Sequence, residues 1–242
     1  MSGGIFLTAE WRHLAMLNYE IGPDILRPYM PAGTELDSWD GKYFVSMVGF
    51  MFLRTRVLGL PVPFHQDFEE VNLRFYVRRK TDEGWRRGVV FIKEIVPRAA
   101  IAFVARVIYN EKYVAMPMRH SIDMAHGALK PEGAVEYLWR WKGRWNHLRV
   151  ETKGAPHPLL TGSEEEFITE HYWGYSAQRN GGPVNYQVEH PRWMVWQSSR
   201  SSFDCDVAGL YGERFVECLS AAPHSAFLAE GSPIIVRRGE KI

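Results

Sequence analysis

The residues best suited to chemistry lie between positions 64 and 118, where charged side chains stand among apolar ones. In the segments FEEVNLRFYV, VVFIKEIV and VARVIYNEKYVAMPM these are Glu70, Arg74, Lys93, Arg106 and Lys112. A carboxyl group can serve as a general acid or base, and an arginine can bind a carboxylate through two hydrogen bonds. What these side chains do depends on which of them face the same space.

Alternation in the segment from 70 to 77 predicts a strand with one face on a core. The apolar positions are Val71, Leu73, Phe75 and Val77. The positions in phase with Glu70 are Asn72, Arg74 and Tyr76. A carboxyl group, an amide, a guanidinium and a phenol therefore share one face. This face either meets water, with ion pairs to neighbouring strands, or lines a polar cavity.

The segment GVVFIKEIV is apolar on both faces except for Lys93 and Glu94, which predicts a central strand whose two charges point in opposite directions. A buried lysine is unfavourable unless it is paired or neutral, so Lys93 is a functional candidate. We favour the alternative that Lys93 forms a structural ion pair or extends its ammonium to a cavity. After Pro97, apolar residues at helical spacing predict a helix, in which Arg106 would tie the helix to the sheet.

Other parts of the chain predict short elements joined by turns. We expect a strand over 15–21, helical turns over 23–31, a turn at Asp40-Gly41, a strand over 42–53 and a loop over 54–64. Residues 134–151 read as a hairpin with a turn at Lys142-Gly143. Ser163 and Glu166 form the pattern of a capping box, and Gly231-Ser232 predicts a turn.

Composition limits the protein class. With 242 residues, 46% hydrophobic and 24% charged, the chain is ordinary for a globular protein, and we expect one domain over 1–242. A net charge of +1 provides no field to attract nucleic acid or an anionic membrane. The tryptophans and arginines of the 134–151 hairpin could form a base-stacking surface, but an aromatic ladder between strands suits the balanced charge better.

Several common sites have no support in the sequence. Cys205 and Cys218 lack the spacing of a zinc site, and His171 follows Glu170 directly and does not complete an HExxH pattern, so we interpret it as structural. There is no phosphate-binding glycine motif, no GxSxG, no secretory signal and no apolar run of ~20 residues. We expect no cofactor and no metal, a cytoplasmic protein, and a small-molecule ligand as the partner. A homo-oligomer is possible.

The ordered phrases LNYEIGPDILRPYMPAGTELDSWDGKYFVSMVGFMF, FEEVNLRFYV, FIKEIVPRAAIAFVARVIYNEKYVAMPMRH, FITEHYWGY and YQVEHPRWMVW resemble the YqjF-like family of uncharacterised bacterial proteins. That family belongs to the acetoacetate decarboxylase-like superfamily. The resemblance covers nearly the whole chain. It implies a mainly β (α+β) fold of antiparallel strands around an internal pocket, with a few short helices.

Acetoacetate decarboxylase uses a Schiff-base lysine whose ammonium is destabilised by its surroundings, an example that general accounts of nucleophilic catalysis already cite. By resemblance, its polar supports fall on Arg12, Glu70 and Arg106. Its reactive lysine falls on Tyr113, and the nearest lysine, Lys112, comes one residue early. The resemblance therefore implies a familiar site from which the usual nucleophile is displaced.

These observations predict a polar-lined pocket for a small, anionic organic molecule. Its ligand-binding residues would be Arg12, Arg74 and Arg106, and its catalytic residues Glu70, Lys112 and Tyr113. Three hypotheses remain. The protein is a lyase that acts on a keto acid through Lys112 or Lys93, an enzyme that uses Glu70 and Tyr113 without a lysine, or a binding protein without catalysis.

Overall fold

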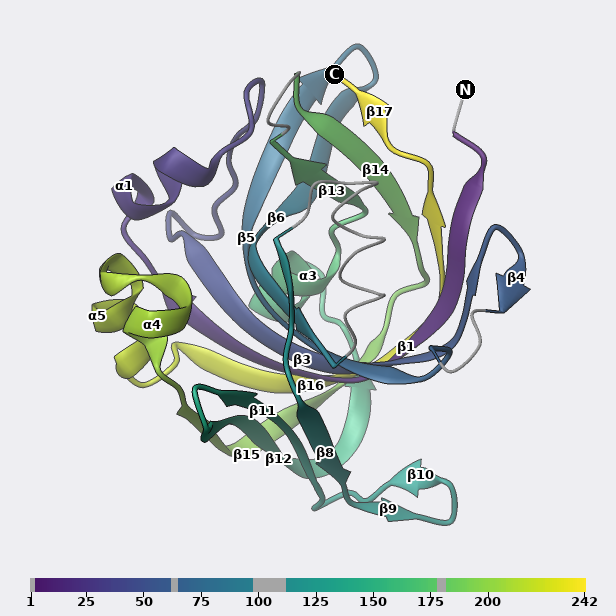
Figure 1. Ribbon diagram of the computed structural model, residues 1–242, viewed down its shortest axis with the longest axis vertical. Coiled ribbons are helices and arrows are strands. Elements are labelled where there is room, and N and C mark those ends of the chain that lie inside the picture. Colours follow the sequence, from purple (N-terminus) through teal and green to yellow (C-terminus); the bar gives the residue numbers. More distant parts are fainter. Residues whose placement is uncertain (1–2, 62–64, 98–111, 178–181) are drawn as a thin grey trace.

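The computed structural model describes residues 3–61, 65–97, 112–177 and 182–242, and its architecture is mainly β with a few short helices, as expected (Figure 1). The strands are β1 (Ile5–Glu20), β2 (Glu35–Leu36), β3 (Phe44–Val57), β4 (Leu60–Pro61), β5 (Phe68–Thr81), β6 (Gly84–Val96), β7 (Tyr113–Ala115), β8 (Met118–Ile122), β9 (Met124–Ala125), β10 (Ala128–Leu129), β11 (Ala134–Trp141), β12 (Arg144–Pro158), β13 (Trp173–Ser176), β14 (Val184–Glu189), β15 (Met194–Asp204), β16 (Ser225–Arg237) and β17 (Glu240–Lys241). The helices are α1 (Pro23–Leu26), α3 (Glu164–Thr169), α4 (Val207–Tyr211) and α5 (Val216–Ser220), with the 3₁₀ turns η1 (Arg27–Tyr29) and η2 (Glu213–Phe215).

One long, strongly curved sheet closes into a barrel. Its neighbouring strands run β14, β13, β6, β5, β3, β1 and β16, and a further pairing of β14 with β16 closes the ring. Most pairs are antiparallel, whereas β13 and β7 lie parallel to β6. Beyond β16 the same sheet continues through β15, β12, β11 and β8, which form a second layer below the barrel (Figure 1).

The barrel closes because β16 changes partner along its length. Ala229 pairs with Val195 of β15, and further along the strand Ile235 pairs with Glu189 of β14. Gly231 lies between these two pairings with a φ of 80°, a left-handed conformation that favours glycine. The predicted turn at Gly231-Ser232 is wrong: the strand runs through it, because a left-handed glycine can also stand inside a strand.

The two faces of the curved sheet bury two separate cores. The barrel interior holds side chains such as Met16, Val48 and Phe227, while the opposite face packs side chains such as Leu17 and Met47 against the second layer. Strand alternation produces this division, since successive residues of one strand point to opposite faces. A strand in the middle of the sheet, such as β5, is therefore buried on both sides.

Most predicted local elements are confirmed. The helical turns begin at Pro23, and β11 and β12 form the expected hairpin. Trp39 and Lys42 bridge around the expected Asp40-Gly41 turn. The predicted loop over 54–64 is wrong in part, because β3 continues to Val57 and returns into β4 through a tight turn at positive φ. The helix predicted after Pro97 lies outside the described residues.

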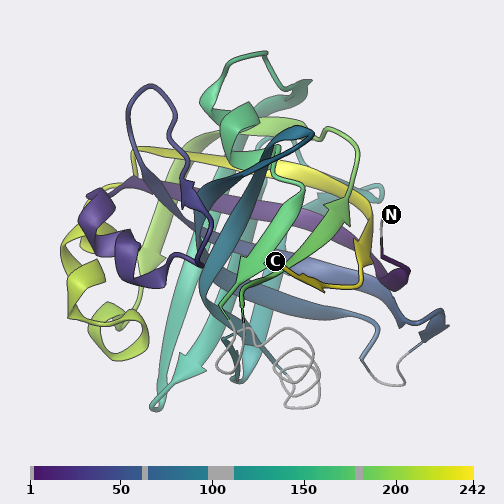
Figure 2. The same cartoon turned by 90° about the horizontal axis from the view of Figure 1, so that it is seen from above.

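Helix α3 covers one end of the barrel interior (Figure 2). The Ser163 hydroxyl accepts a hydrogen bond from the backbone N–H of Glu166 (3.1 Å), as the capping pattern predicts, although the Glu166 carboxylate accepts from Gly162 rather than from Ser163. The ring of Phe167 packs on Tyr76 with 5.2 Å between ring centroids. Helices α1, α4 and α5 gather on the outside of the barrel (Figure 2).

We expect Gly231→Ala to destabilise the fold by more than 2 kcal/mol. A Cβ at this position would lie 2.0 Å from the carbonyl oxygen of Trp11, and positive φ adds backbone strain. Urea denaturation of the purified protein measures the difference. Gly22→Ala is the control, because its φ is −64° and no atom lies within 4 Å of its added methyl group. Equal effects of the two substitutions would contradict a special role for Gly231.

Candidate functional site

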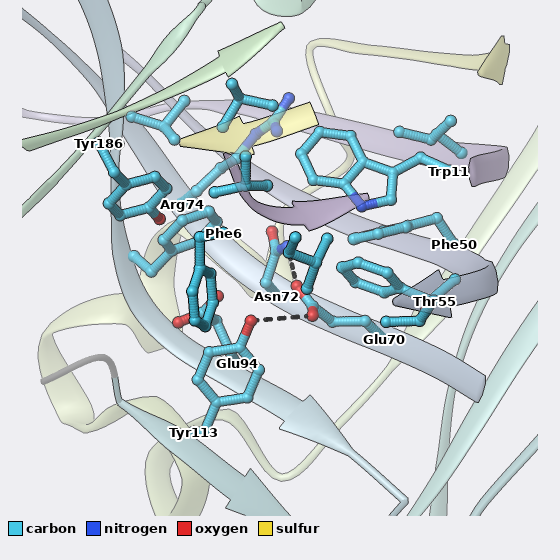
Figure 3. A pocket seen from close by; sticks show the side chains of 18 of the residues that line it. Phe6, Trp11, Phe50, Thr55, Glu70, Asn72, Arg74, Glu94, Tyr113 and Tyr186 are labelled. Carbon is cyan, nitrogen blue, oxygen red and sulfur yellow. Dashed lines mark hydrogen bonds between the residues drawn. The ribbon is translucent and has the colours of Figure 1, made fainter. Parts of the chain in front are cut away.

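A cavity of about 200 Å³ lies inside the barrel (Figure 3). Most of its lining is apolar, with aromatic side chains that include Phe6, Trp11, Phe50, Phe52 and Phe91. Polar groups concentrate in one cluster, which contains Glu70, Asn72, Arg74, Glu94, Tyr113 and His171. The lining is therefore less polar than the sequence predicts. A mainly apolar cavity with a few convergent polar groups is the usual form of a small-molecule site.

Strand β5 supplies the centre of the polar cluster. Glu70, Asn72 and Arg74 share its inner face and all three are buried, whereas Leu73 and Phe75 point to the outer core. Alternation predicts that these three side chains share a face. The sequence left open whether this face meets water or lines a cavity, and in the structure it lies inside the barrel. The neighbouring residue Tyr76 is also buried, and its hydroxyl lies 2.6 Å from that of Ser46.

Glu70 is a buried carboxyl group of the cluster with a raised pKa. Only 2% of the residue is exposed, and its two oxygens accept hydrogen bonds from Asn72 Nδ2 (2.9 Å) and from the Tyr113 hydroxyl (3.1 Å) (Figure 3). Burial raises the pKa of Glu70 to about 7, although both hydrogen bonds and the charge of Arg74 oppose that rise. Glu70 can therefore give up or accept a proton near neutral pH.

A second buried carboxyl group, Glu94, lies beside the first. It is opposite Asn72 in the pairing of β5 with β6 and next to Tyr113 in the pairing of β6 with β7, and it is 1% exposed. Glu70, Glu94 and the Tyr113 phenol therefore meet on one side of the cavity (Figure 3). The sequence indicated that Glu94 and Lys93 face opposite ways, but not that Glu94 faces Asn72.

Arg74 is a buried guanidinium with few partners. Its Nη2 donates to the carbonyl oxygen of Ile168 (3.2 Å), and its guanidinium carbon lies 5.8 Å from the ring centroid of Tyr76. Among the described residues it forms no ion pair, and its buried Nε has no hydrogen-bond acceptor. A buried charge in this state is unfavourable unless something else supplies the opposite charge.

The two candidate lysines lie on the other side of the sheet. Lys93 donates a hydrogen bond to the carbonyl oxygen of Leu210, and its Nζ is 5.7 Å from the ring centroid of Tyr211. Burial, together with the nearby charge of Lys112, lowers the pKa of Lys93. Lys112 is exposed, with its Nζ 4.9 Å from the ring centroid of Tyr29.

None of the eight lysines of the chain, all of which are in the described part, lines the cavity. Lys112 is thus not placed with the other predicted catalytic residues, Glu70 and Tyr113. The alternation of β6 and β7 explains this, because Glu94 and Tyr113 face inward and their preceding neighbours face outward.

The remaining predicted residues have different outcomes. Arg12 does not line the cavity: it donates hydrogen bonds to Glu10 Oε2 (2.9 Å) and to the carbonyl oxygen of Gly231 (3.3 Å). Its neighbour Trp11 lines the cavity instead. Arg106 lies outside the described residues.

Two searches of the described part of the chain concern metal-ligand clusters and membrane-spanning helices. No group of three or more His, Cys, Asp or Glu side chains there is arranged to hold a metal ion. None of the helices in these residues has both the length and the apolar character that crossing a bilayer requires.

Comparisons with known proteins agree with this architecture. The family DUF2071, described as an uncharacterized conserved protein, matches residues 8–233. The uncharacterized protein YqjF of Bacillus subtilis is 26% identical over 198 residues, which are 79% of this chain and 76% of YqjF.

Solved structures with the same fold include acetoacetate decarboxylase-like enzymes. The enduracididine biosynthesis enzyme MppR superposes with a TM-score of 0.69 at 14% identity, over 98% of this chain and 89% of MppR. Acetoacetate decarboxylase from Legionella pneumophila superposes with a TM-score of 0.66 at 13% identity, over 99% and 88% of the two chains. At this level of identity the similarity concerns the fold alone.

We expect Glu70→Gln to stabilise the protein relative to the wild type as pH rises. In the unfolded chain the Glu70 pKa is near 4.5, and in the fold it is about 7, so the wild type loses about 3 kcal/mol of stability between these pH values. The uncharged amide does not titrate. Urea denaturation from pH 4.5 to 8 measures the difference between the two proteins.

Substitution of the exposed Glu132 by Gln is the control, and its effect should stay flat over the same pH range. A difference between wild type and Glu70→Gln that does not change with pH would show that Glu70 ionises normally in the folded protein.

Proposed function

The chain belongs to the DUF2071 family of uncharacterized conserved proteins, and we propose that its cavity binds a small organic anion. The observation that carries this proposal is the buried guanidinium of Arg74, which forms no ion pair among the described residues. An anionic ligand would supply the missing charge through a charge-assisted hydrogen bond, the strongest kind of polar contact available there.

The remaining walls suit the carbon skeleton of such a ligand. Aromatic and aliphatic side chains from seven strands surround the polar cluster, among them Trp11, Phe50, Phe68 and Val89. Burial of apolar ligand surface contributes about 25 cal/mol per Å². The cavity thus combines an apolar body with a few polar groups that fix orientation.

A second candidate function is an enzyme that transfers protons without a lysine. The observation that favours it is the hydrogen bond between the Tyr113 hydroxyl and Glu70, whose pKa is about 7. Such a carboxyl group can take a proton from a bound ligand and return it at another atom, while the phenol donates to the developing negative charge. Consumption of the ligand distinguishes this function from simple binding.

The route through a lysine imine has less support. A Schiff base requires an amine nitrogen within bonding distance of the ligand carbonyl carbon, and no lysine lines the cavity. MppR has been solved with pyruvate and with a pyruvate condensation product, but the similarity to it at 13–14% identity carries no information about ligands of this chain.

We expect Arg74→Met to abolish the binding of small carboxylates. A thermal-shift screen of carboxylates should raise the melting temperature of the wild type, because a ligand that binds the folded state stabilises it. The apolar replacement keeps the volume but removes the charge, so the free variant should be no less stable than the wild type. Arg79→Met, on the opposite face of β5, is the control. Equal shifts in both variants would refute the role of Arg74.

We expect borohydride to leave the protein unmodified in the presence of keto acids. An imine would be reduced to a stable adduct, whereas a cavity without a lysine forms none. Mass spectrometry of the treated protein checks this, and a Lys93→Ala, Lys112→Ala double variant should keep the ligand-induced thermal shift. An adduct on either lysine would restore the imine hypothesis.

A further inference from the structure

The cavity has a carboxyl end, at which Glu70, Glu94 and Tyr113 lie. Glu94 pairs with Asn72 across β5 and β6, and Tyr113 pairs with Glu94 across β6 and β7. The Glu70 carboxylate reaches the same level, because it accepts hydrogen bonds from Asn72 Nδ2 and from the Tyr113 hydroxyl. The register of three strands therefore brings two buried carboxyl groups and a phenol together.

Arg74 lies apart from this group (Figure 3). Its guanidinium turns towards α3, where Nη2 donates to the carbonyl oxygen of Ile168 (3.2 Å), whereas Glu70 turns towards Tyr113 of β7. Four residues of extended strand separate the α-carbons of Glu70 and Arg74 by about 13 Å. The groups that carry negative charge and the guanidinium therefore occupy separate ends of one cavity.

The carboxyl end presents hydrogen-bond acceptors to a ligand. When Glu70 is ionised, the Tyr113 O–H and an N–H of Asn72 already donate to its two oxygens. A carboxylate has about four acceptor positions, so lone pairs remain on Glu70. A keto or carboxylate oxygen of a ligand would add one more acceptor here, and a methyl group would cover the carboxylate without replacing its hydrogen bonds to water. A protonated amine matches both the acceptors and their negative charge.

We propose that the ligand of the cavity is a carboxylate that also carries a protonated amine at its far end, with the carboxylate on Arg74 and the amine beside Glu70 and Glu94. This inference rests on the proposed binding of an organic anion, and it specifies the class of that anion as an ω-amino acid. An alkyl chain separates the two charges of such a ligand, as the two ends of the cavity are separated. The aromatic walls, among them Phe50 and Phe91, cover the chain.

Ligands of matched chain length test the inference. Isothermal titration calorimetry at pH 8 compares 4-aminobutanoate, 6-aminohexanoate and 8-aminooctanoate with butanoate, hexanoate and octanoate. We expect the best amino acid to bind at least tenfold more tightly than its unsubstituted partner, the effect of a hydrogen bond between charged groups.

Two further ligands test the position and the sign of the second charge. Norleucine, the α-amino isomer of 6-aminohexanoate, should bind no more tightly than hexanoate, because both of its charges lie at one end. Adipate should bind more weakly than hexanoate, because its second carboxylate meets Glu70 and Glu94. Equal affinity for adipate and 6-aminohexanoate would contradict the inference.

Variants assign the amine to the carboxyl end. Glu70→Gln removes the negative charge and keeps the shape of the side chain. We expect the preference for 6-aminohexanoate over hexanoate to fall at least fivefold in this variant, while hexanoate binds at least as tightly as to the wild type. Glu94→Gln, which changes the second carboxyl group, should have the same effect. Glu132→Gln, at an exposed position, is the control and should leave both Kd values unchanged.

The preference for the amine should also depend on pH. The amine, with a pKa of about 10 as in lysine, stays protonated from pH 6 to pH 8, whereas Glu70, with a pKa of about 7, ionises over this range. Around Glu70, the charged and titratable groups of the described residues are Arg74 of β5, Glu94 of β6 and Tyr113 of β7. The ratio of the hexanoate Kd to the 6-aminohexanoate Kd should rise several-fold from pH 6 to pH 8 in the wild type, and much less in Glu70→Gln.

The outcomes separate the two proposals. If no amino acid of the series binds more tightly than its unsubstituted partner, or if the preference persists in both Glu70→Gln and Glu94→Gln, the inference about the amine is wrong while binding of an anion at Arg74 stands. If no carboxylate binds the wild type, with or without an amine, or if hexylamine binds as tightly as 6-aminohexanoate, the proposed function itself is wrong.

Discussion

Burial of charge on the inner face of β5 is the constraint on which the cavity depends. An ionised side chain loses several kcal/mol of hydration free energy inside a protein unless partners replace the water. Glu70 meets this cost with two hydrogen bonds and a raised pKa, while Arg74 has one carbonyl oxygen. The large apolar cores on both faces of the sheet must offset the difference. Groups that weaken the free fold in this way concentrate at functional sites.

The alternation of side chains along β6 and β7 determines which functional groups face the cavity. Lys93 and Glu94 are neighbours, as are Lys112 and Tyr113, yet within each pair one side chain faces the cavity and the other the outside of the barrel. A shift of one residue would exchange the two sets, because side chains alternate with a period of two. The pairing of β7 with β6 holds the carboxyl groups and the phenol inside.

The sequence predicts the local part of this site but not the part that depends on distant segments. Alternation alone puts Glu70 and Arg74 on one face. Whether that face meets water depends on closure of the barrel by β14 and β16, which strand patterns do not determine. The position of His171 against Tyr76 likewise depends on the tertiary fold, which brings the segment after α3 against β5. Trp11 rather than Arg12 lines the cavity because His13, with a φ of 57°, interrupts the alternation of β1.

A barrel with an apolar interior changes the pKa of a lysine and of a carboxyl group for the same physical reason. At 12–14% identity the fold of acetoacetate decarboxylase-like enzymes persists although most side chains differ. A dry, apolar interior destabilises charged forms, so it lowers the pKa of a lysine and raises that of a carboxyl group. Tyr113, which the sequence resemblance aligns with the reactive lysine, here donates to Glu70. Burial in the interior can therefore bring the pKa of a carboxyl group near neutrality as readily as that of an amine. Which of the two groups is present depends on the residue type at the position that faces the cavity.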